Sequence, residues 1–218
     1  MKIKTVIFDL DGTLLDTLED LTDAVNHALS IFQMPKRDIS EIRQFVGNGI
    51  RRLMLQTVPN GESNPDFEAV FAEFRRYYDI HCNDKTKPYE GIMELLDALE
   101  NNNIQTAIVS NKVDSAVQIL NKRYFPQIAV AVGDREGLQR KPAPDSVFLA
   151  MEMYHAKREE TVYVGDSEVD IETAKNAGIK CVSVLWGFRD REQLLESGAQ
   201  VLIEEPLALL ELIKNETI

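Results

Sequence analysis

The stretch Thr5-Val6-Ile7-Phe8-Asp9-Leu10-Asp11-Gly12-Thr13 decides the fold of this chain. Its first four residues favour β structure and predict a buried strand over residues 5–8. Two carboxylates, Asp9 and Asp11, follow at once. Asp and Gly are common turn residues, so this stretch taken alone would indicate only a turn. In an extended segment, however, residues i and i+2 point the same way, so both carboxyl groups are expected to face one site.

The composition indicates a folded protein that does not bind nucleic acid. Its 218 residues suffice for one large domain or for a domain with an insertion, and an apolar content of 44% supports a packed core. The net charge is −12, from 36 acidic and 24 basic residues, whereas phosphate backbones attract basic patches. An anionic substrate would therefore need a few local lysines or arginines, or a bound cation.

The cysteines and the N-terminus predict a cytoplasmic protein. Cys82 and Cys181 fit no metal-binding spacing and are expected to be reduced thiols, and the histidines form no zinc motif. The apolar run after Lys2 and Lys4 is too short for a signal peptide, and no segment reaches the length of a membrane span. We therefore expect no membrane partner.

Hydrophobic periodicity divides the chain into two styles. Up to residue 86 the pattern after the first strand is helical, with a capping box at Asp38 and Glu41. Beyond it, strands and helices alternate, as in βαβ units with a parallel sheet. The expected helices cover residues 18–32, 38–47, 50–54, 67–78, 90–100, 113–122, 144–154 and 171–177, and the later strands cover residues 105–109, 128–132, 161–164 and 181–185.

These patterns predict the fold class and the domains. The fold class is α/β, a doubly wound parallel sheet with a helical domain inserted after the first strand. The α/β core is expected to comprise residues 1–15 and 87–218, and the α-helical insertion residues 16–86.

Polar side chains follow three of the predicted strands. Asp9 and Asp11 follow the first strand, Ser110-Asn111-Lys112 the second, and Gly165-Asp166 with Asp170 a third. Ligands of open parallel sheets bind beyond the carboxyl ends of the strands, so these residues are expected to share a site. The chain has neither the Gly and Glu spacing of an EF-hand from Asp9 nor the Gly-Lys-Ser/Thr of a P-loop.

Four motifs in this order resemble the signatures of the haloacid dehalogenase superfamily. They are Asp9-x-Asp11-Gly12-Thr13, Ser110, Lys141 and Gly165-Asp166-x₃-Asp170. The resemblance covers nearly the whole chain, and although each motif is weak alone, the ordered set is specific. The stretches most similar to the phosphoglycolate phosphatase branch are Phe45-Val46-Gly47-Asn48-Gly49, Ser110-Asn111-Lys112 and Arg140-Lys141-Pro142-Ala143-Pro144-Asp145.

The resemblance implies a Rossmann-like core, a mobile helical cap and a Mg²⁺-dependent phosphomonoester hydrolase that forms an aspartyl-phosphate, with 2-phosphoglycolate as the leading substrate. Asp9 would be the nucleophile. Asp11 would give the leaving oxygen a proton and then activate water. A halide leaves without a proton, so Asp11 argues for phosphate esters over true dehalogenation. Many relatives have Thr where this chain has Ser110, and the hydroxyl is kept.

The same resemblance implies the remaining site residues. Asp9, Asp11 through its backbone carbonyl, Asp166 and Asp170 would hold Mg²⁺, although Asp166 could belong to a turn and Asp170 to a helix N-terminus. Lys112 is open between a substrate contact and a solvated charge. The expected phosphate-binding residues are Thr13, Ser110, Asn111 and Lys141, the last with a surface lysine as its plain alternative.

In the helical insertion, a glycine-rich turn with a following arginine is the candidate for substrate selection. We hypothesise that Gly47, Asn48, Gly49 or Arg51 meets the non-phosphate end of the substrate, with a flexible turn and solvated arginines as the alternative. The aromatic stripe that begins at Phe67 is expected to be core. No role is assigned to Trp186-Gly187-Phe188-Arg189, which follows the last predicted strand.

Other functions remain open at this point. A sugar-phosphate mutase similar to β-phosphoglucomutase would use the same pair of aspartates, and an inorganic pyrophosphatase of the superfamily is a further alternative. A non-catalytic Mg²⁺-binding module is a third. A receiver-like domain is about half this length and has no helical insertion. The expected partner is a small phosphate ester, and the chain could be a monomer or a homodimer.

Overall fold

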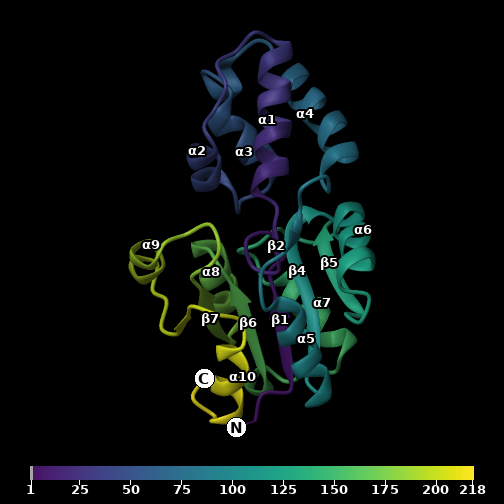
Figure 1. The fold of residues 1–218 in the computed structure, drawn as a ribbon, viewed down its shortest axis with the longest axis vertical. Helices are drawn as coiled ribbons and strands as arrows, with labels where there is room; N and C mark the ends of the chain where they lie inside the picture. The colour runs from purple at the N-terminus through teal and green to yellow at the C-terminus, as the bar shows by residue number, and fades with distance from the viewer. Residues whose placement is uncertain (1) are drawn as a thin grey trace. The chain divides into compact units, whose positions relative to one another are not determined.

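The computed structural model describes residues 2–218, which form two compact units (Figure 1). The α/β unit comprises Pro88–Ile218 together with the N-terminal stretch that ends at Leu15, and the helical unit comprises Asp16–Lys87. The two short strands β2 (Leu15–Asp16) and β3 (Lys87–Pro88) pair with each other at the points where the chain passes from one unit to the other.

A six-stranded parallel sheet forms the centre of the α/β unit, with the order β5-β4-β1-β6-β7-β8. Strand β1 lies inside this sheet because β4 pairs with one of its edges and β6 with the other. Such a position is a topological switch point, where ligands bind beyond the strand ends. The strands are β1 (Thr5–Phe8), β4 (Gln105–Val113), β5 (Val130–Asp134), β6 (Thr161–Gly165), β7 (Lys180–Val184) and β8 (Leu202–Ile203).

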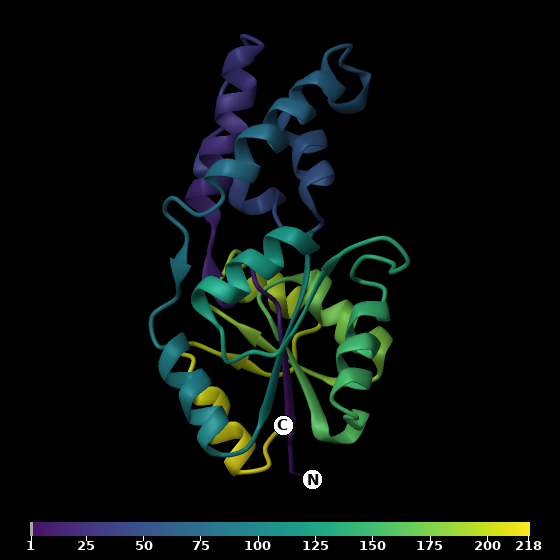
Figure 2. The same cartoon turned by 90° about the vertical axis from the view of Figure 1, so that its right-hand side faces the viewer.

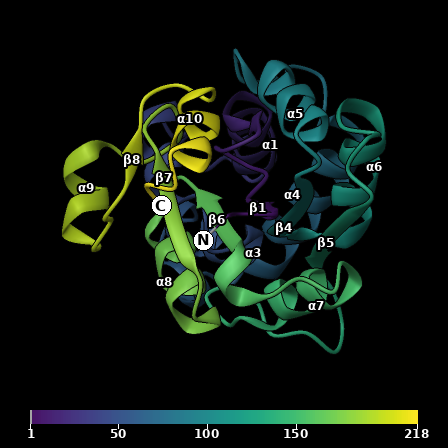
Figure 3. The same ribbon diagram turned by 90° about the horizontal axis from the view of Figure 1, so that it is seen from below.

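Helices cover both faces of this sheet, as Figure 3 shows. Side chains alternate between the faces of a strand, so Val6 and Phe8 join one buried core and Ile7 the other. Helices α5 (Ile92–Asn101), α6 (Asp114–Tyr124) and α10 (Ala208–Lys214) pack on the Val6 face, and α7 (Asp145–Met153) and α8 (Glu168–Ala177) on the Ile7 face. The fold class predicted from the sequence is confirmed.

The helical unit packs its helices around a separate apolar core. Figure 2 shows α1 beside α4, and their buried residues recur at the three- and four-residue spacing of an amphipathic helix. The predicted capping box of Asp38 and Glu41 begins α2. The elements of this unit are α1 (Leu18–Ile31), α2 (Ile39–Phe45), α3 (Ile50–Thr57), the 3₁₀ turn η1 (Gly61–Ser63) and α4 (Phe67–His81).

The last part of the chain differs most from the predictions. No element was predicted beyond residue 185, yet α9 (Arg191–Glu196), β8 and α10 follow, and a 3₁₀ turn η2 (Arg158–Glu160) precedes β6. The predicted start of α8 at residue 171 was also wrong. The helix begins at Glu168 because Ser167 and Asp170 form a capping box. Its first turn has no repeat of apolar residues, so hydrophobic periodicity did not indicate it. No helix within residues 2–218 has the length and apolar character needed to cross a bilayer.

Candidate active site

Three strand ends bring the predicted site residues together in the α/β unit. Asp9 directly follows β1, and Asp166 directly follows β6. Ser110 lies in the second half of β4, toward its carboxyl end. The backbone N–H of Asp9 still donates to the carbonyl of Val164 over 2.9 Å, so the parallel pairing continues one residue past β1. Adjacent parallel strands therefore deliver these three side chains to the same edge of the sheet.

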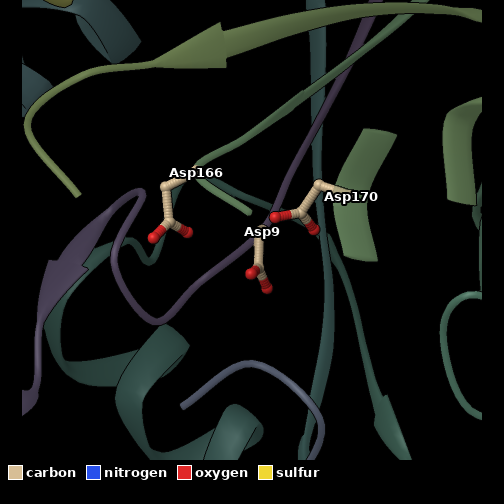
Figure 4. Close-up of side chains that lie close together, drawn as sticks. All are labelled: Asp9, Asp166 and Asp170. Atoms are coloured by element: carbon tan, nitrogen blue, oxygen red, sulfur yellow. The ribbon is translucent and has the colours of Figure 1, made fainter. Parts of the chain in front are cut away.

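Asp9, Asp166 and Asp170 form a buried acid cluster. Each offers one carboxylate oxygen, and these oxygens lie within 4.8 Å of one another. Figure 4 shows the three carboxyl groups gathered at the ends of β1 and β6 and the start of α8. The residues are 7%, 1% and 0% exposed, in that order, so water does little to screen their mutual repulsion.

Lys141 supplies a buried positive charge to this acid cluster. Its Nζ lies 2.9 Å from Oδ1 of Asp9 and 2.8 Å from Oδ1 of Asp170. It also donates to the hydroxyl of Tyr163 over 2.9 Å. Since the residue is only 4% exposed, the surface-lysine alternative is wrong. Tyr163 was predicted only as part of a strand, and nothing in its sequence position indicated this contact.

Burial and charge shift the titration of these groups. Burial raises the pKa of Asp9 well above its ordinary value, Lys141 opposes that rise, and the neighbouring carboxylates add to it. Burial, followed by the charge of Asp170, raises the pKa of Asp166 to about 7. Burial alone would lower the pKa of Lys141, but Asp170 and Asp9 more than offset it, so the lysine is charged.

Asp166 is held by hydrogen bonds from two loops. The hydroxyl of Thr13 donates to Oδ1 over 3.1 Å, and the backbone N–H of Phe188 donates to Oδ2 over 2.7 Å. Gly12 has a φ of +83°, and a Cβ there would lie 2.4 Å from Oδ2 of Asp166. Only glycine allows this close approach. The expected contact of Thr13 with phosphate stays a prediction, since its hydroxyl donates to Asp166 here.

The segment Trp186-Gly187-Phe188-Arg189, to which the sequence assigned no role, braces the site. The indole Nε1–H of Trp186 donates to the carbonyl of Thr13 over 2.9 Å. A Cβ on Gly187 would lie 2.3 Å from both the carbonyl oxygen of Gly12 and the Cβ of Asp166. The available signal was a glycine between two aromatic residues directly after a buried strand.

Asp11 lies outside the acid cluster and has its own lysine. Lys112 Nζ donates to Oδ1 of Asp11 over 2.8 Å, and Lys112 is 5% exposed, so the solvated-charge alternative for Lys112 is wrong. Ser110 is buried beside it, and its Oγ accepts from the backbone N–H of Lys112 over 3.1 Å. The serine hydroxyl hydrogen is therefore free to donate to a ligand.

Asp170 and Asn111 make structural contacts in addition to their expected roles. Asp170 lies in the first turn of α8, as the alternative of an acid at a helix N-terminus predicted. Its Oδ2 accepts from the N–H and the hydroxyl of Ser167, and its Oδ1 accepts from Lys141. The side-chain amide of Asn111 donates to the carbonyl of Lys141 over 3.1 Å. Both residues thus position Lys141, and their ligand roles stay predictions.

The candidate substrate-selecting residues lie in the helical unit. Gly49, with a φ of +81°, is the N-cap of α3, so the predicted glycine-rich turn does begin a helix. Gly47 has a φ of +123°. Arg51 Nη2 lies 2.6 Å from Oε1 of Glu68, and its guanidinium lies over the ring of Phe67 at 5.2 Å. Residues of its own unit thus hold Arg51, but its side chain is still 38% exposed, so both its proposed substrate contact and the solvated-arginine alternative stay open.

The donor chemistry of the acid cluster fits a hard divalent cation. Three buried carboxylates face one ammonium, that of Lys141, which leaves an excess of negative charge in a region of low dielectric. Carboxylate oxygens are the ligands that Mg²⁺ prefers. The pKa of Asp166 is raised first by burial and then by the charge of Asp170, and a bound cation would offset both effects. Each of the three carboxylates could supply a ligand oxygen, although both oxygens of Asp166 and both oxygens of Asp170 also accept hydrogen bonds from the protein.

Comparison with known proteins agrees with this geometry. The family model of haloacid dehalogenase-like hydrolases matches residues 6–184. Phosphoglycolate phosphatase 1 of Pseudomonas aeruginosa is 33% identical over 218 residues, which covers 95% of this chain and 78% of that protein. N-acetylmuramic acid 6-phosphate phosphatase of the same organism is 29% identical over 216 residues, covering 98% of this chain and 96% of that protein.

A solved structure is similar over the full length. The crystal structure of a candidate phosphoglycolate phosphatase from Lactobacillus delbrueckii subsp. bulgaricus has a TM-score of 0.93 and 34% identity, covering 98% of this chain and 99% of that chain. The chain belongs to the haloacid dehalogenase-like hydrolases. Within that family it is a phosphatase of the phosphoglycolate phosphatase-like branch, as the motifs predicted.

Proposed function

We propose that this phosphatase is a Mg²⁺-dependent phosphomonoester hydrolase that works through an aspartyl-phosphate on Asp9. The observation that supports this proposal best is the buried acid cluster with a single lysine, placed at the switch point of the sheet. A buried carboxylate that a lysine orients is a suitable nucleophile, because it has lost most of its hydration shell.

The reaction uses the two aspartates of the first motif in two steps. An oxygen of the Asp9 carboxylate attacks phosphorus, the bond from phosphorus to the leaving oxygen breaks, and the proton of Asp11 passes to that oxygen to form the alcohol. Water then attacks the phosphorus of the aspartyl-phosphate while the Asp11 carboxylate takes one of its protons. The bond from phosphorus to the Asp9 oxygen breaks, which releases phosphate and restores both aspartates.

Charge and hydrogen-bond donors for the phosphoryl group come from residues around Asp9. Lys141 orients the nucleophile through its 2.9 Å contact and opposes the negative charge that gathers as two anions meet. Ser110 and Asn111 are neighbours in the second half of β4. Their hydroxyl and amide groups, together with the hydroxyl of Thr13, are the proposed donors to phosphoryl oxygens.

Mg²⁺, when bound by Asp9, Asp166 and the backbone carbonyl of Asp11, would neutralise the charge on the phosphoryl group and on the nucleophile. Asp170 supports this site by holding Lys141. Removal of Mg²⁺ with EDTA is therefore expected to abolish phosphate release. Addition of Mg²⁺ is expected to raise the melting temperature of the protein. Asp166→Asn is expected to lose that thermal response.

The substrate class that we propose is a small phosphate ester that also carries a carboxylate, with 2-phosphoglycolate first. Two relatives are named for 2-phosphoglycolate and for N-acetylmuramic acid 6-phosphate, and both compounds combine a phosphate ester with a carboxylate. The helical unit, residues 16–86 in the sequence prediction, is proposed to be a cap, and Arg51 with the Gly47-Asn48-Gly49 turn is proposed to select the substrate.

We also propose a cytoplasmic location, as the sequence predicted. Cys82 and Cys181 form no disulfide, and a reducing compartment would keep both as thiols.

The test is phosphate release from a panel of esters, with and without Mg²⁺, beside the variant Asp9→Asn. The panel comprises 2-phosphoglycolate, N-acetylmuramic acid 6-phosphate, sugar phosphates, nucleotides and pyrophosphate. Mg²⁺-dependent release that Asp9→Asn loses is the expected result, and the ranking identifies the substrate. No release by the folded protein would contradict the proposal and favour the mutase, to be assayed with an activating bisphosphate. Release from pyrophosphate alone would favour the pyrophosphatase.

A further inference from the structure

Lys112 is a buried lysine whose ammonium points at Asp11. Its Nζ lies 2.8 Å from Oδ1 of Asp11, with side-chain exposures of 4% for the lysine and 16% for the aspartate. Lysine is almost never buried unless it is paired, because desolvation of the ammonium is costly. A surface ion pair between these residues would need no special explanation, but a buried one does, because both charges have lost most of their contact with water.

The backbone around Lys112 is anchored by the sheet. Strand β4 continues to Val113, and Val113 pairs with Asp134 of β5 after an irregularity in the register. The backbone N–H of Lys112 donates to Oγ of Ser110 over 3.1 Å. The lysine side chain therefore starts from a well-placed backbone, which limits the positions that its ammonium can reach.

Asp9 and Asp11 are only two residues apart, yet each has a different lysine. Lys141 lies 2.9 Å from Asp9, and Lys112 lies 2.8 Å from Asp11. A single lysine between the two carboxylates would stabilise the negative charge of both to a similar extent. Two lysines allow the two carboxylates to be held independently, as a nucleophile and a proton carrier require.

We infer that Lys112 is a positioning residue for Asp11 in proton transfer, an inference that rests on the proposed function. Because the ammonium binds Oδ1, Oδ2 is the oxygen left to carry the proton to the leaving oxygen. Negative charge develops on Asp11 as that proton leaves, and the nearby ammonium stabilises this charge in the transition state. In the second step the same contact holds the carboxylate that takes a proton from water.

The test compares two leaving groups. An alkyl phosphate such as 2-phosphoglycolate needs a proton on its leaving oxygen, whereas p-nitrophenolate is a stable anion and leaves without one. Lys112→Met is expected to lower kcat for the alkyl phosphate at least about tenfold more than kcat for p-nitrophenyl phosphate, within the range of general acid catalysis. Lys112→Arg, which keeps a charged donor, is expected to restore part of the difference. Lys122→Met, on the exposed side of α6, is the control and is expected to match the wild type.

A double variant tests whether Lys112 acts through Asp11. If it does, Asp11→Asn combined with Lys112→Met is expected to cost no more on the alkyl phosphate than Asp11→Asn alone, because the second change removes nothing further. Circular dichroism melts establish that each variant is folded. If Lys112→Met does not fold, Lys112→Gln, which keeps an uncharged donor, replaces it.

The possible results separate this inference from the proposed function. Equal losses on both substrates, or additive losses in the double variant, would show a merely structural lysine and overturn the inference. A rise in KM restricted to substrates with a carboxylate would overturn it in favour of a direct substrate contact. Phosphate release that persists in Asp9→Asn would instead contradict the proposed function, whatever Lys112→Met does.

Discussion

The ammonium of Lys141 lies 2.9 Å from Oδ1 of Asp9, and both side chains are buried. The same ammonium lies 2.8 Å from Asp170 in the first turn of α8. One charge therefore connects the end of β1 to the start of a distant helix. The position of Asp9, the proposed nucleophile, depends on this contact, since the other carboxylates of the acid cluster repel it.

Lys141→Met is expected to impair both stability and activity. Removal of one partner from a buried ion pair leaves uncompensated charge, which lowers the free energy of unfolding by about 3–5 kcal/mol. Phosphate release is expected to fall by about 100-fold or more, since a charge aimed at the reacting group is lost. Urea unfolding and phosphate assays measure the two effects, and Lys175→Met, an exposed lysine of α8, is the control. A Lys141→Met protein as stable as the wild type would show that the contact contributes nothing.

Without metal, the protein is expected to lose stability as the pH rises through about 7. The pKa of Asp166 is about 7 in the folded protein, mainly because of burial, against an ordinary value of 3.8. Between these values the folded protein holds a proton that the unfolded chain has released, so the associated stability is present at low pH and is lost above the folded pKa.

Thermal melts in EDTA at about pH 5.5 and about pH 8.5 test this pH dependence, and the melting temperature is expected to be lower at the higher pH by several degrees. Asp166→Asn cannot titrate, so its difference between the two pH values is expected to be smaller. A wild-type melting temperature that is unchanged or higher at the higher pH would refute the prediction.

Gly187→Ala is expected to weaken Mg²⁺ binding. The added Cβ would lie 2.3 Å from the Cβ of Asp166 and from the carbonyl oxygen of Gly12, so the backbone of one loop must shift and carry Asp166 with it. Trp186 is the only tryptophan, and its indole contacts the adjacent loop, so its fluorescence reports a Mg²⁺ titration. In Gly137→Ala the Cβ meets no atom within 4 Å, so this control is expected to keep wild-type Mg²⁺ affinity despite its φ of +87°. Equal affinity in all three proteins would contradict the bracing role of this segment.

Arg51→Ala is expected to change substrate preference more than stability. The ion pair of Arg51 with Glu68 is exposed and contributes little to folding. If Arg51 binds the substrate carboxylate, KM for 2-phosphoglycolate rises in Arg51→Ala while KM for an ester without a carboxylate is unchanged. Arg75→Ala, an exposed arginine of α4, is the control. An unchanged ranking of substrates would contradict this role and would leave Arg51 with only a structural contact, its ion pair from α3 to Glu68 of α4.

Local patterns predicted most of the fold. The strand over residues 5–8 and the long helices α1 and α4 lie where periodicity placed them, because burial of one face imposes a regular spacing on each. The region after residue 185 was not predicted. Strand β8 has two residues and α9 has six, too few for a periodic pattern, and β8 exists because β7 offers it an edge to pair with.

The order of the motifs also predicted which residues meet. Asp9 and Asp166 follow neighbouring strands, and Ser110 lies in the second half of β4, so a parallel sheet must bring these residues to one edge. The partners of these side chains could not be predicted. The N–H of Phe188 on Asp166 and the hydroxyl of Tyr163 on Lys141 depend on loop paths and rotamers that no sequence pattern specifies.

The sequence by itself determined the class of fold, the family and the carboxylates and lysines of the candidate site, because hydrophobic periodicity, strand order and motif order are properties of the chain. Only the tertiary structure decided how those groups are paired. It assigned Lys141 to Asp9 and Lys112 to Asp11, and it placed the Trp186–Arg189 segment against Asp166. The physical reason is that ion pairing within a buried site depends on distances of a few ångströms between side chains from separate strands, helices and loops, and those distances exist only once the sheet has formed.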